Sequence, residues 1–181
     1  MRLIQDGPRD ARIMIVGEAP GGTEIARGIP FCGISGSILN EMLEGIGIQR
    51  SEVFVTNICH VRPKGNEFDW FFSPENFEEH YKPGVLQLQA DILEINPTLI
   101  IALGKFAAQS LLNTTSTIGS LRGKLHDYHG VPVIVTYHPA YLLRTLADKA
   151  KAWEDLCFAR SSMQALQSAV KPQSSKLLSP E

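Results

Sequence analysis

Cysteine is scarce in this sequence. The 181 residues include only Cys32, Cys59 and Cys157, which are widely spaced and form no Cys-x-x-Cys pair. An odd number of scattered cysteines argues against a disulfide framework. Outside the motifs described below, the histidines also show no spacing typical of metal ligands. We therefore expect three reduced, mostly buried thiols and no metal site.

Long apolar runs and net charge are lacking as well. No run approaches the roughly 20 apolar residues that a membrane-spanning helix needs, and residues 1–6 do not resemble a signal peptide. We therefore expect a cytosolic or nuclear location by default, and specifically a cytoplasmic one, with no membrane partner. The formal net charge of -2 gives no overall attraction to nucleic acid, so any DNA binding must use a local basic patch.

Apolar runs and helical patterns alternate along the chain, whose composition is that of an ordinary globular protein. Continuous apolar runs predict four buried strands, at residues 11–16, 53–58, 98–103 and 131–137. Helical spacing of apolar residues predicts helices at residues 35–46, about 85–95, 105–112 and 149–166. Ser35 is the expected N-cap of the first helix.

Strands made of continuous apolar runs, alternating with helices, are typical of a parallel sheet covered on both faces. We therefore predict an α/β fold, a three-layer α/β/α sandwich with a central, mostly parallel four-stranded sheet. Residues 1–167 should form a single domain, and the polar residues 168–181 a disordered tail. The aromatic-rich residues 64–84 should form a surface insertion with one helical turn after Ser73-Pro74.

A glycine-rich turn at residues 17–22 follows the first predicted strand. It allows close approach of the backbone to a ligand, but it lacks the ending of a P-loop and the spacing of a dinucleotide fingerprint. Glu18 lies inside the turn and Glu24 shortly after it. A carboxylate at a strand end is suited to holding or activating a water, although either residue could instead cap a helix or pair with Arg27.

Three further side chains are candidates for the same site. Phe31, flanked by chain-stiffening residues, could stack on a flat ligand or belong to the core. The amide of Asn57, at a strand end, could match a pyrimidine edge or cap a turn. His138 could donate to a ring oxygen that gains charge as a bond breaks, or serve the turn it lies in. Ligands of such sheets bind at the carboxyl ends of the strands, where all three are expected.

A possible DNA surface lies near the last two motifs. It comprises Arg122, Lys124, Tyr141, Leu142, Leu143 and Arg144. Leucines beside an arginine are suited to opening a base stack, or they form an ordinary helical turn. The basic side chains could contact phosphates or simply be solvated.

In order and spacing, these segments resemble the uracil-DNA glycosylase superfamily, and specifically its thermophile-type family 4, over about residues 13–155. The matching segments are residues 17–21, 24–25, 28–33, 56–57, 62–63, 102–104, 121–124 and 138–144. This resemblance implies how a base is bound. Phe31 would stack on a flipped uracil, Asn57 would recognise its edge, and backbone groups near Gly17 and Glu18 would bind a carbonyl.

The resemblance also implies the chemistry, which is hydrolysis of the N-glycosidic bond through an oxocarbenium-like sugar. Glu18 or Glu24 would position the water, and His138 would stabilise the departing uracil anion. Leu142 and Leu143 would enter the duplex. The chain would then be a monofunctional uracil-DNA glycosylase of base excision repair, acting as a monomer on uracil-containing DNA.

The sequence departs from family 4 at its iron–sulfur cysteines. That family has two cysteines before the first strand, one in a Lys-Cys-Arg-Pro segment and one later. Here no cysteine precedes Cys32, and the corresponding segment is His60-Val61-Arg62-Pro63. Four thiolates cannot be assembled from three cysteines, so we expect no cluster and no other cofactor. The aromatic residues of 64–84 should cover that surface instead.

Two other departures concern specificity and activity. Ile25 replaces an Asp of the family, while Glu24 is kept. Gly21 stands where the main uracil glycosylase family has a tyrosine that blocks thymine. This leaves open a 5-modified uracil or hypoxanthine as the substrate. The lost cluster and net acidity leave open a catalytically silent nucleic-acid or protein-binding module, whereas a nucleotide-binding protein would explain neither His138 nor the leucines.

The purified protein is expected to contain neither iron nor acid-labile sulfide, because it lacks the four thiolates of the family's cluster. Metal analysis and a sulfide assay on protein purified without oxygen will measure this. Stoichiometric iron together with sulfide would contradict the expectation.

Overall fold

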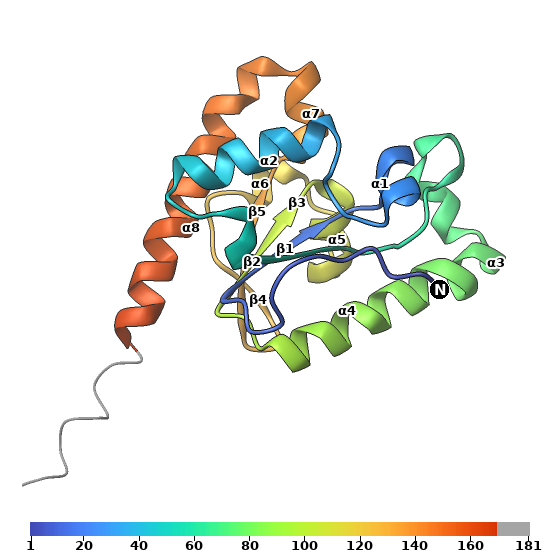
Figure 1. Cartoon of the computed structure of the whole chain (residues 1–181), viewed down its shortest axis with the longest axis horizontal. Coiled ribbons are helices and arrows are strands. Elements are labelled where there is room, and N and C mark those ends of the chain that lie inside the picture. The colour runs from blue at the N-terminus through green and yellow to red at the C-terminus, as the bar shows by residue number, and fades with distance from the viewer. Residues whose placement is uncertain (170–181) are drawn as a thin grey trace, which may run out of the picture.

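A central sheet organises the computed structural model, which describes residues 1–169 (Figure 1). Its strands are β1 Ile13–Gly17, β2 Val53–Asn57, β3 Leu99–Leu103, β4 His126–Tyr128 and β5 Val131–Thr136. They lie in the order β2-β1-β3-β5-β4, and all neighbours are parallel except β4 and β5, which are antiparallel. The four strands predicted from apolar runs are confirmed, with small shifts at their ends.

The fifth strand, β4, was not expected, so the predicted four-stranded sheet is one edge strand short. β4 has three residues, none of them buried, and therefore lacks the apolar run on which the prediction relied. It reaches β5 through a tight turn in which His129 and Gly130 have φ values of 47° and 90°. Two consecutive residues with positive φ are typical of a type I′ hairpin turn.

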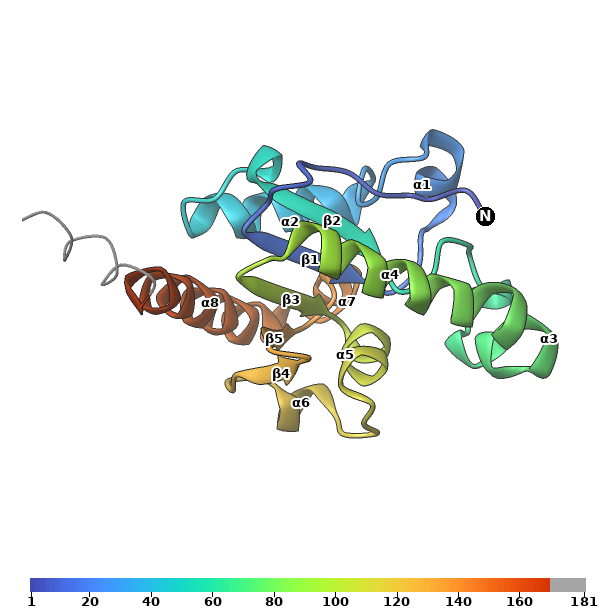
Figure 2. The ribbon, with the colours of Figure 1, turned by 90° about the horizontal axis from the view of Figure 1, so that it is seen from below.

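Helices cover both faces of the sheet and make three layers (Figure 2). They are α1 Gly22–Arg27, α2 Ile34–Gly45, α3 Pro74–Asn76, α4 Lys82–Ile95, α5 Lys105–Leu112, α6 Ile118–Leu121, α7 Pro139–Arg144 and α8 Lys149–Ala169. The apolar side chains of α4 and α5 pack on one face, and those of α2 and α8 pack on the other. Among the described residues, none of these helices is long and apolar enough to cross a membrane.

The predicted helices are present, with two corrections. α2 begins at Ile34 after Gly33, and no side chain caps it, so the expectation that Ser35 is its N-cap is wrong. α8 continues through Ala169, so the first two residues of the expected tail are helical. The rest of that tail lies outside the described residues.

Residues 64–84 contain more helical turns than expected, and part of the segment is buried. A 3-10 helix at Phe68–Phe72 leads into α3, whose first turn is capped by the Ser73 hydroxyl, and a π-helix at Phe77–Tyr81 then leads into α4. The predicted turn after Ser73-Pro74 is confirmed. Phe71 is fully buried and stacks near Phe106 of α5, with ring centroids 5.7 Å apart, so the segment contributes to the core.

The N-terminal segment runs along the outer edge of β2. The backbone of Asp6 exchanges two hydrogen bonds with Val55, of 3.0 and 2.7 Å. Further back, the Ile4 N–H donates to His60 Nδ1 at 3.1 Å, and both residues are buried. Burial lowers the pKa of His60, which favours the neutral ring that can accept this bond. His60 thus anchors this segment by a hydrogen bond.

The Phe71→Ala variant is expected to lose about 3–5 kcal/mol of unfolding free energy, because it leaves a cavity beside Phe106. Phe72, which is 52% exposed, provides the matched control, and Phe72→Ala should cost about 1 kcal/mol or less. Urea denaturation of both variants measures the difference. Equal losses would show that residues 64–84 do not contribute to the core through Phe71.

Candidate active site

A cavity of about 390 Å³ opens at the carboxyl ends of the strands. Five of the residues predicted from the sequence line it together, namely Glu24, Phe31, Asn57, His138 and Leu143. The rest of its wall comes from the glycine-rich turn, the start of α2 and the start of α7. The expected convergence of these motifs is therefore present, and it arises from three separate chain segments.

Asn57 ends β2 and is 2% exposed. Its Oδ1 accepts no hydrogen bond from any described residue, although it is fully buried. A buried carbonyl without a partner costs about 1–3 kcal/mol. A β-carbon on Gly17, its neighbour in the parallel register, would clash with this oxygen, so a glycine is needed there. The amide therefore offers a free acceptor. Its Oδ1 accepts no N–H of a turn among the described residues, so it does not cap a turn there.

Phe31 forms a wall of the cavity in an unusual backbone conformation, with φ at 51°. Its ring stacks against that of His138, with centroids 5.4 Å apart and 30° between the planes. The residue is also part of the apolar cluster beneath α2. The two possibilities for Phe31, ligand contact and core packing, are therefore compatible.

His138 precedes α7 and caps it, because its Nδ1 accepts the Ala140 N–H at 3.1 Å. That bond leaves the ring hydrogen on Nε2 in the neutral form. Burial, with a smaller contribution from the nearby charge of Arg144, lowers the pKa of His138 to about 4. The imidazole is therefore neutral near pH 7 and can still donate one hydrogen bond.

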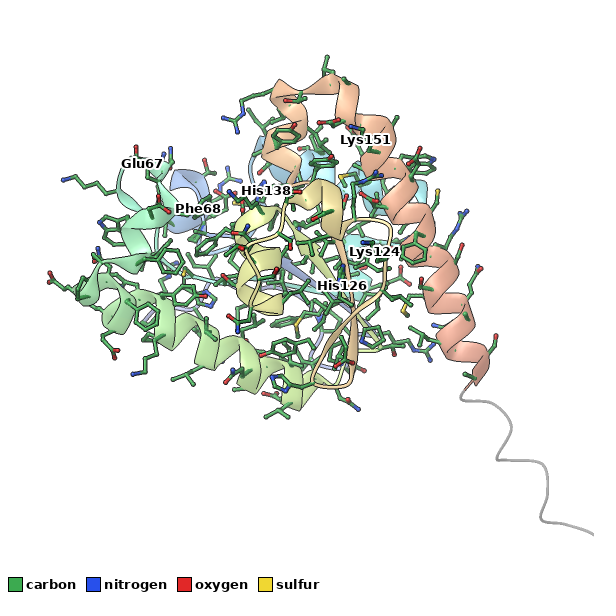
Figure 3. All side chains as sticks on the ribbon, turned by 180° about the vertical axis from the view of Figure 1, so that it is seen from behind. Glu67, Phe68, Lys124, His126, His138 and Lys151 are labelled. Carbon is green, nitrogen blue, oxygen red and sulfur yellow. The ribbon has the colours of Figure 1, made fainter. Side chains whose placement is uncertain are left out.

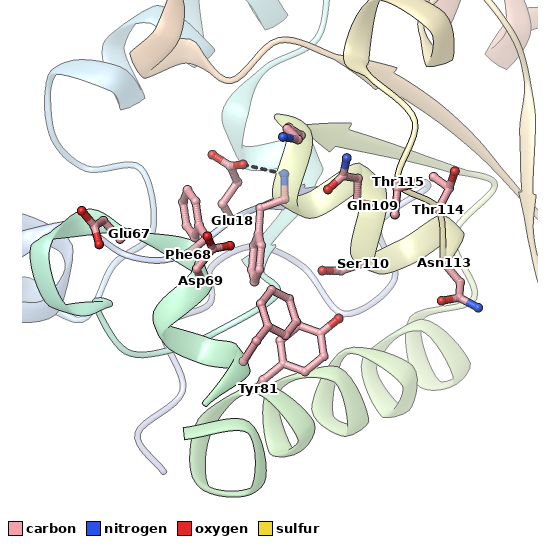
Figure 4. Close-up of a pocket in the computed structure, with 13 residues that line it drawn as sticks. Glu18, Glu67, Phe68, Asp69, Tyr81, Gln109, Ser110, Asn113, Thr114 and Thr115 are labelled. Atoms are coloured by element: carbon pink, nitrogen blue, oxygen red, sulfur yellow. Dashed lines mark hydrogen bonds between the residues drawn. The ribbon is translucent and has the colours of Figure 1, made fainter. Parts of the chain in front are cut away.

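The two candidate carboxylates face different cavities. Glu24 lines the cavity that holds Asn57, whereas Glu18 lines a neighbouring one of about 990 Å³ beside Phe68 and Phe106 (Figure 4). Glu18 Oε2 accepts the Phe106 N–H at 2.8 Å and so caps the start of α5. The helix-capping alternative therefore applies to Glu18, and Glu24 is the carboxylate available to a ligand beside Asn57.

Close packing around Glu18 affects its ionisation. Gly104 has φ at 95°, and a β-carbon there would lie 2.7–2.9 Å from the Glu18 carboxylate. Burial raises the pKa of Glu18 to about 7, against the smaller lowering effect of the bond from Phe106. The connection between β1 and α5 is therefore made by a carboxyl group that titrates near neutral pH.

The expected DNA surface is only partly supported by the exposure of its residues. Leu143 is 41% exposed and lines the cavity, but Leu142 is 2% exposed and therefore does not lie on the surface where it was expected. Leu142 is buried in α7, a helix that packs against α2. Tyr141 donates its hydroxyl to Asp148 at 2.7 Å, while Arg144 is exposed.

The two basic residues after α6 differ. Arg122 donates to Asp155, to Glu154 and to the Lys151 carbonyl at 3.1, 3.2 and 2.8 Å. These contacts tie Arg122 to α8, and its contact with phosphate stays a prediction. Lys124 is exposed and lies with Lys151 on the α8 side of His138 (Figure 3).

Two residues of this region were not identified from the sequence. Ile34 lines the cavity and is 75% exposed at the first turn of α2. Arg50, in the 3-10 helix Arg50–Glu52, donates to the carbonyl of Pro30, next to Phe31. Nothing in its local sequence indicates that contact, because Pro30 is 20 residues away along the chain. Within residues 1–169, no group of three or more ligating side chains could hold a metal ion.

The chain belongs to the uracil-DNA glycosylase superfamily, whose family model matches residues 4–157. It is 39% identical over 145 residues to the type-4 uracil-DNA glycosylase of Archaeoglobus fulgidus, which covers 76% of this chain and 69% of that protein. The corresponding protein of Pyrobaculum aerophilum is 37% identical, covering 83% and 78%. That of Thermotoga maritima is 35% identical, covering 88% and 81%. The resemblance to family 4 is confirmed.

Glu18→Gln is expected to change how stability depends on pH. The folded state holds the Glu18 proton up to about pH 7, whereas the unfolded chain loses it near the ordinary value of 4.5. The parent therefore loses stability as pH rises through this window, by on the order of 2–3 kcal/mol, and the variant does not. Between about pH 5 and pH 8, the unfolding free energy of the variant should therefore rise by that amount relative to that of the parent. A pH-independent difference would contradict the assignment.

Proposed function

We propose that this chain is a DNA glycosylase that hydrolyses the N-glycosidic bond of a uracil flipped out of DNA, leaving an abasic site. One observation carries the proposal, namely that the buried Asn57 Oδ1 has no partner within residues 1–169 and that Asn57 lines a cavity together with Phe31 and His138. The names of the related proteins support it, since each is called a uracil-DNA glycosylase.

The unpartnered oxygen of Asn57 suits the edge of uracil. Uracil presents an N–H at position 3, which Oδ1 would accept, and a carbonyl at position 4, to which the Asn57 amide would donate. Cytosine presents an acceptor at position 3 and would leave two acceptors facing each other. Leaving a buried polar group unpaired costs about 1–3 kcal/mol, so this amide orientation favours uracil over cytosine.

The remaining side chains suit the bond cleavage. As the bond between C1′ and N1 breaks, its electron pair leaves with the base and negative charge grows on the carbonyl oxygens of the base. The Nε2–H of neutral His138 would donate to that charge. Water would attack C1′ of the oxocarbenium-like sugar while Glu24, which lines the same cavity, accepts its proton. The base anion would then take a proton from solvent.

The rim of the cavity suits an extruded nucleotide. Leu143 projects there with an exposed apolar side chain, and Arg144 follows it. An apolar wedge can fill the space that a flipped base leaves in the stack, while a cation contacts phosphate. Lys124 would add a second phosphate contact. One copy of the chain supplies all these groups, so we propose that it acts as a monomer.

A second candidate substrate is a uracil with a substituent at position 5. Gly21 and Gly22 line the cavity without a side chain, which leaves space along that wall. A β-carbon on Gly21 would lie 2.7 Å from Glu24 Oε2, so a larger residue there would displace the carboxylate. The wall is thus open beside the group proposed to activate water.

Release of free base from oligonucleotides with one uracil is expected, from both single and double strands. Asn57→Ala and His138→Ala should each lower the single-turnover rate by about 10²–10⁴-fold, because each removes a group that contacts the base. His129→Asn is a matched control, since His129 is exposed in the β4–β5 turn and asparagine tolerates its positive φ.

The outcomes separate the candidates. Release of 5-substituted uracil but not of uracil would favour the second substrate. A folded parent protein that binds uracil-containing DNA and releases no base, with binding unchanged in both variants, would mean that the site does not catalyse base release.

A further inference from the structure

The backbone of Phe31 is held in a conformation that a phenylalanine rarely adopts. Its φ of 51° lies in the left-handed region, where residues other than glycine, asparagine and aspartate are uncommon. Such conformations are unfavourable and persist only where neighbouring contacts hold them. The ring that lines the cavity beside His138 therefore depends on contacts made by other residues.

One contact comes from outside the motifs of the site. Arg50 Nη2 donates to the carbonyl oxygen of Pro30 at 2.6 Å, immediately before Phe31. The same guanidinium lies 3.5 Å from Asn40 Oδ1 and 3.7 Å from Asp6 Oδ2. Its side chain is 20% exposed, and its Nε is buried with no partner among the described residues. Burying part of a guanidinium is unfavourable, so its place beside Pro30 calls for an explanation.

The other side of Phe31 is held by close packing. A β-carbon on Gly36, in the first turns of α2, would overlap the Phe31 carbonyl oxygen. The ring itself lies against Gly17, where a β-carbon would be 2.7 Å from two of its carbons. Phe31 is therefore confined by Gly36 and Gly17, while Arg50 holds the carbonyl that precedes it.

We propose that Arg50 is a positioning residue of this site, whose guanidinium holds the Pro30 carbonyl and so fixes the Phe31 ring beside His138 and Asn57. The inference rests on the proposed function, because the ring is the surface on which the base would stack. A displacement of about 1 Å at a reacting centre can lower a rate by about a hundredfold. Lysine cannot reproduce this arrangement, since it is a single point charge without the planar fork of arginine.

A double-mutant cycle tests the proposal. Arg50→Ala should lower the single-turnover rate of uracil release by on the order of ten- to a hundredfold, with a smaller effect on the Kd for an uncleavable 2′-fluoro-deoxyuridine oligonucleotide. In a Phe31→Ala background, the same change should lower the rate by less than about threefold, because the ring through which it acts is gone. Arg50→Lys should be intermediate.

Chemical rescue is a second readout that a general loss of stability would not give. A surface hollow of about 920 Å³ is lined by Arg50, Asp6 and Asn40, so the space left by Arg50→Ala is reachable from solvent. Guanidinium ion at a concentration far below denaturing should restore part of the rate. Sodium chloride at equal ionic strength is the control, because DNA binding weakens with salt. No rescue is expected in the double variant.

Arg9→Ala is a matched control for removing an arginine. Arg9 forms ion pairs with Asp91 and Glu94, and it does not line the cavity. The Arg9→Ala variant should release uracil at the same single-turnover rate as the parent. Thermal unfolding identifies any variant that fails to fold, and Arg50→Lys then takes the place of Arg50→Ala in the cycle.

Equal rate losses in both backgrounds, an unchanged rate in Arg50→Ala, or no rescue by guanidinium would each overturn the role of Arg50. A parent that releases no uracil would instead count against the proposed function. Failure of the inference and failure of the proposed function are therefore distinguishable.

Discussion

The pocket depends on the absence of one side chain where β1 and β2 end together. In the parallel register Gly17 lies opposite Asn57, and a β-carbon there would collide with both the Asn57 carbonyl and the Phe31 ring. Because that space is left to the two larger groups, an amide and an aromatic ring converge on one cavity. His138, which follows β5, then completes the set against the Phe31 ring. The sheet brings these segments together, and the glycine lets them approach.

The surroundings of this pocket show how the chain is held without a cluster of cysteines. The N-terminal segment is attached to β2 through Asp6 and to His60 through a buried hydrogen bond. In a second region, rings from residues 64–84 gather around Phe106, whose backbone N–H also donates to Glu18. Hydrogen bonds and aromatic packing thus hold the segments that flank the site. In this arrangement Glu18 accepts a hydrogen bond from the start of α5, whereas Glu24 lines the cavity.

The sequence predicted well the features that depend on local pattern. Continuous apolar runs located β1, β2, β3 and β5, and their ends located the residues that converge. The three-residue, polar β4 was missed because a short edge strand leaves no apolar pattern. The difference between Leu142 and Leu143, and between Glu18 and Glu24, depends on which neighbour each side chain faces. Arg50 was missed for a related reason, since its contact with Pro30 exists only once β2 and α2 have packed.

The short helix α7 has a mechanical consequence. His138 closes its first turn through its own ring nitrogen, and Leu143 projects from the same helix onto the cavity rim. Under the proposed function, the hydrogen-bond donor and the wedge are therefore parts of one short helix. Insertion of Leu143 into a duplex would then place the His138 imidazole beside the base, because the same short helix carries both side chains. An undistorted duplex that keeps the leucine out would hold the donor away from its target, which makes fidelity a property of how the enzyme docks.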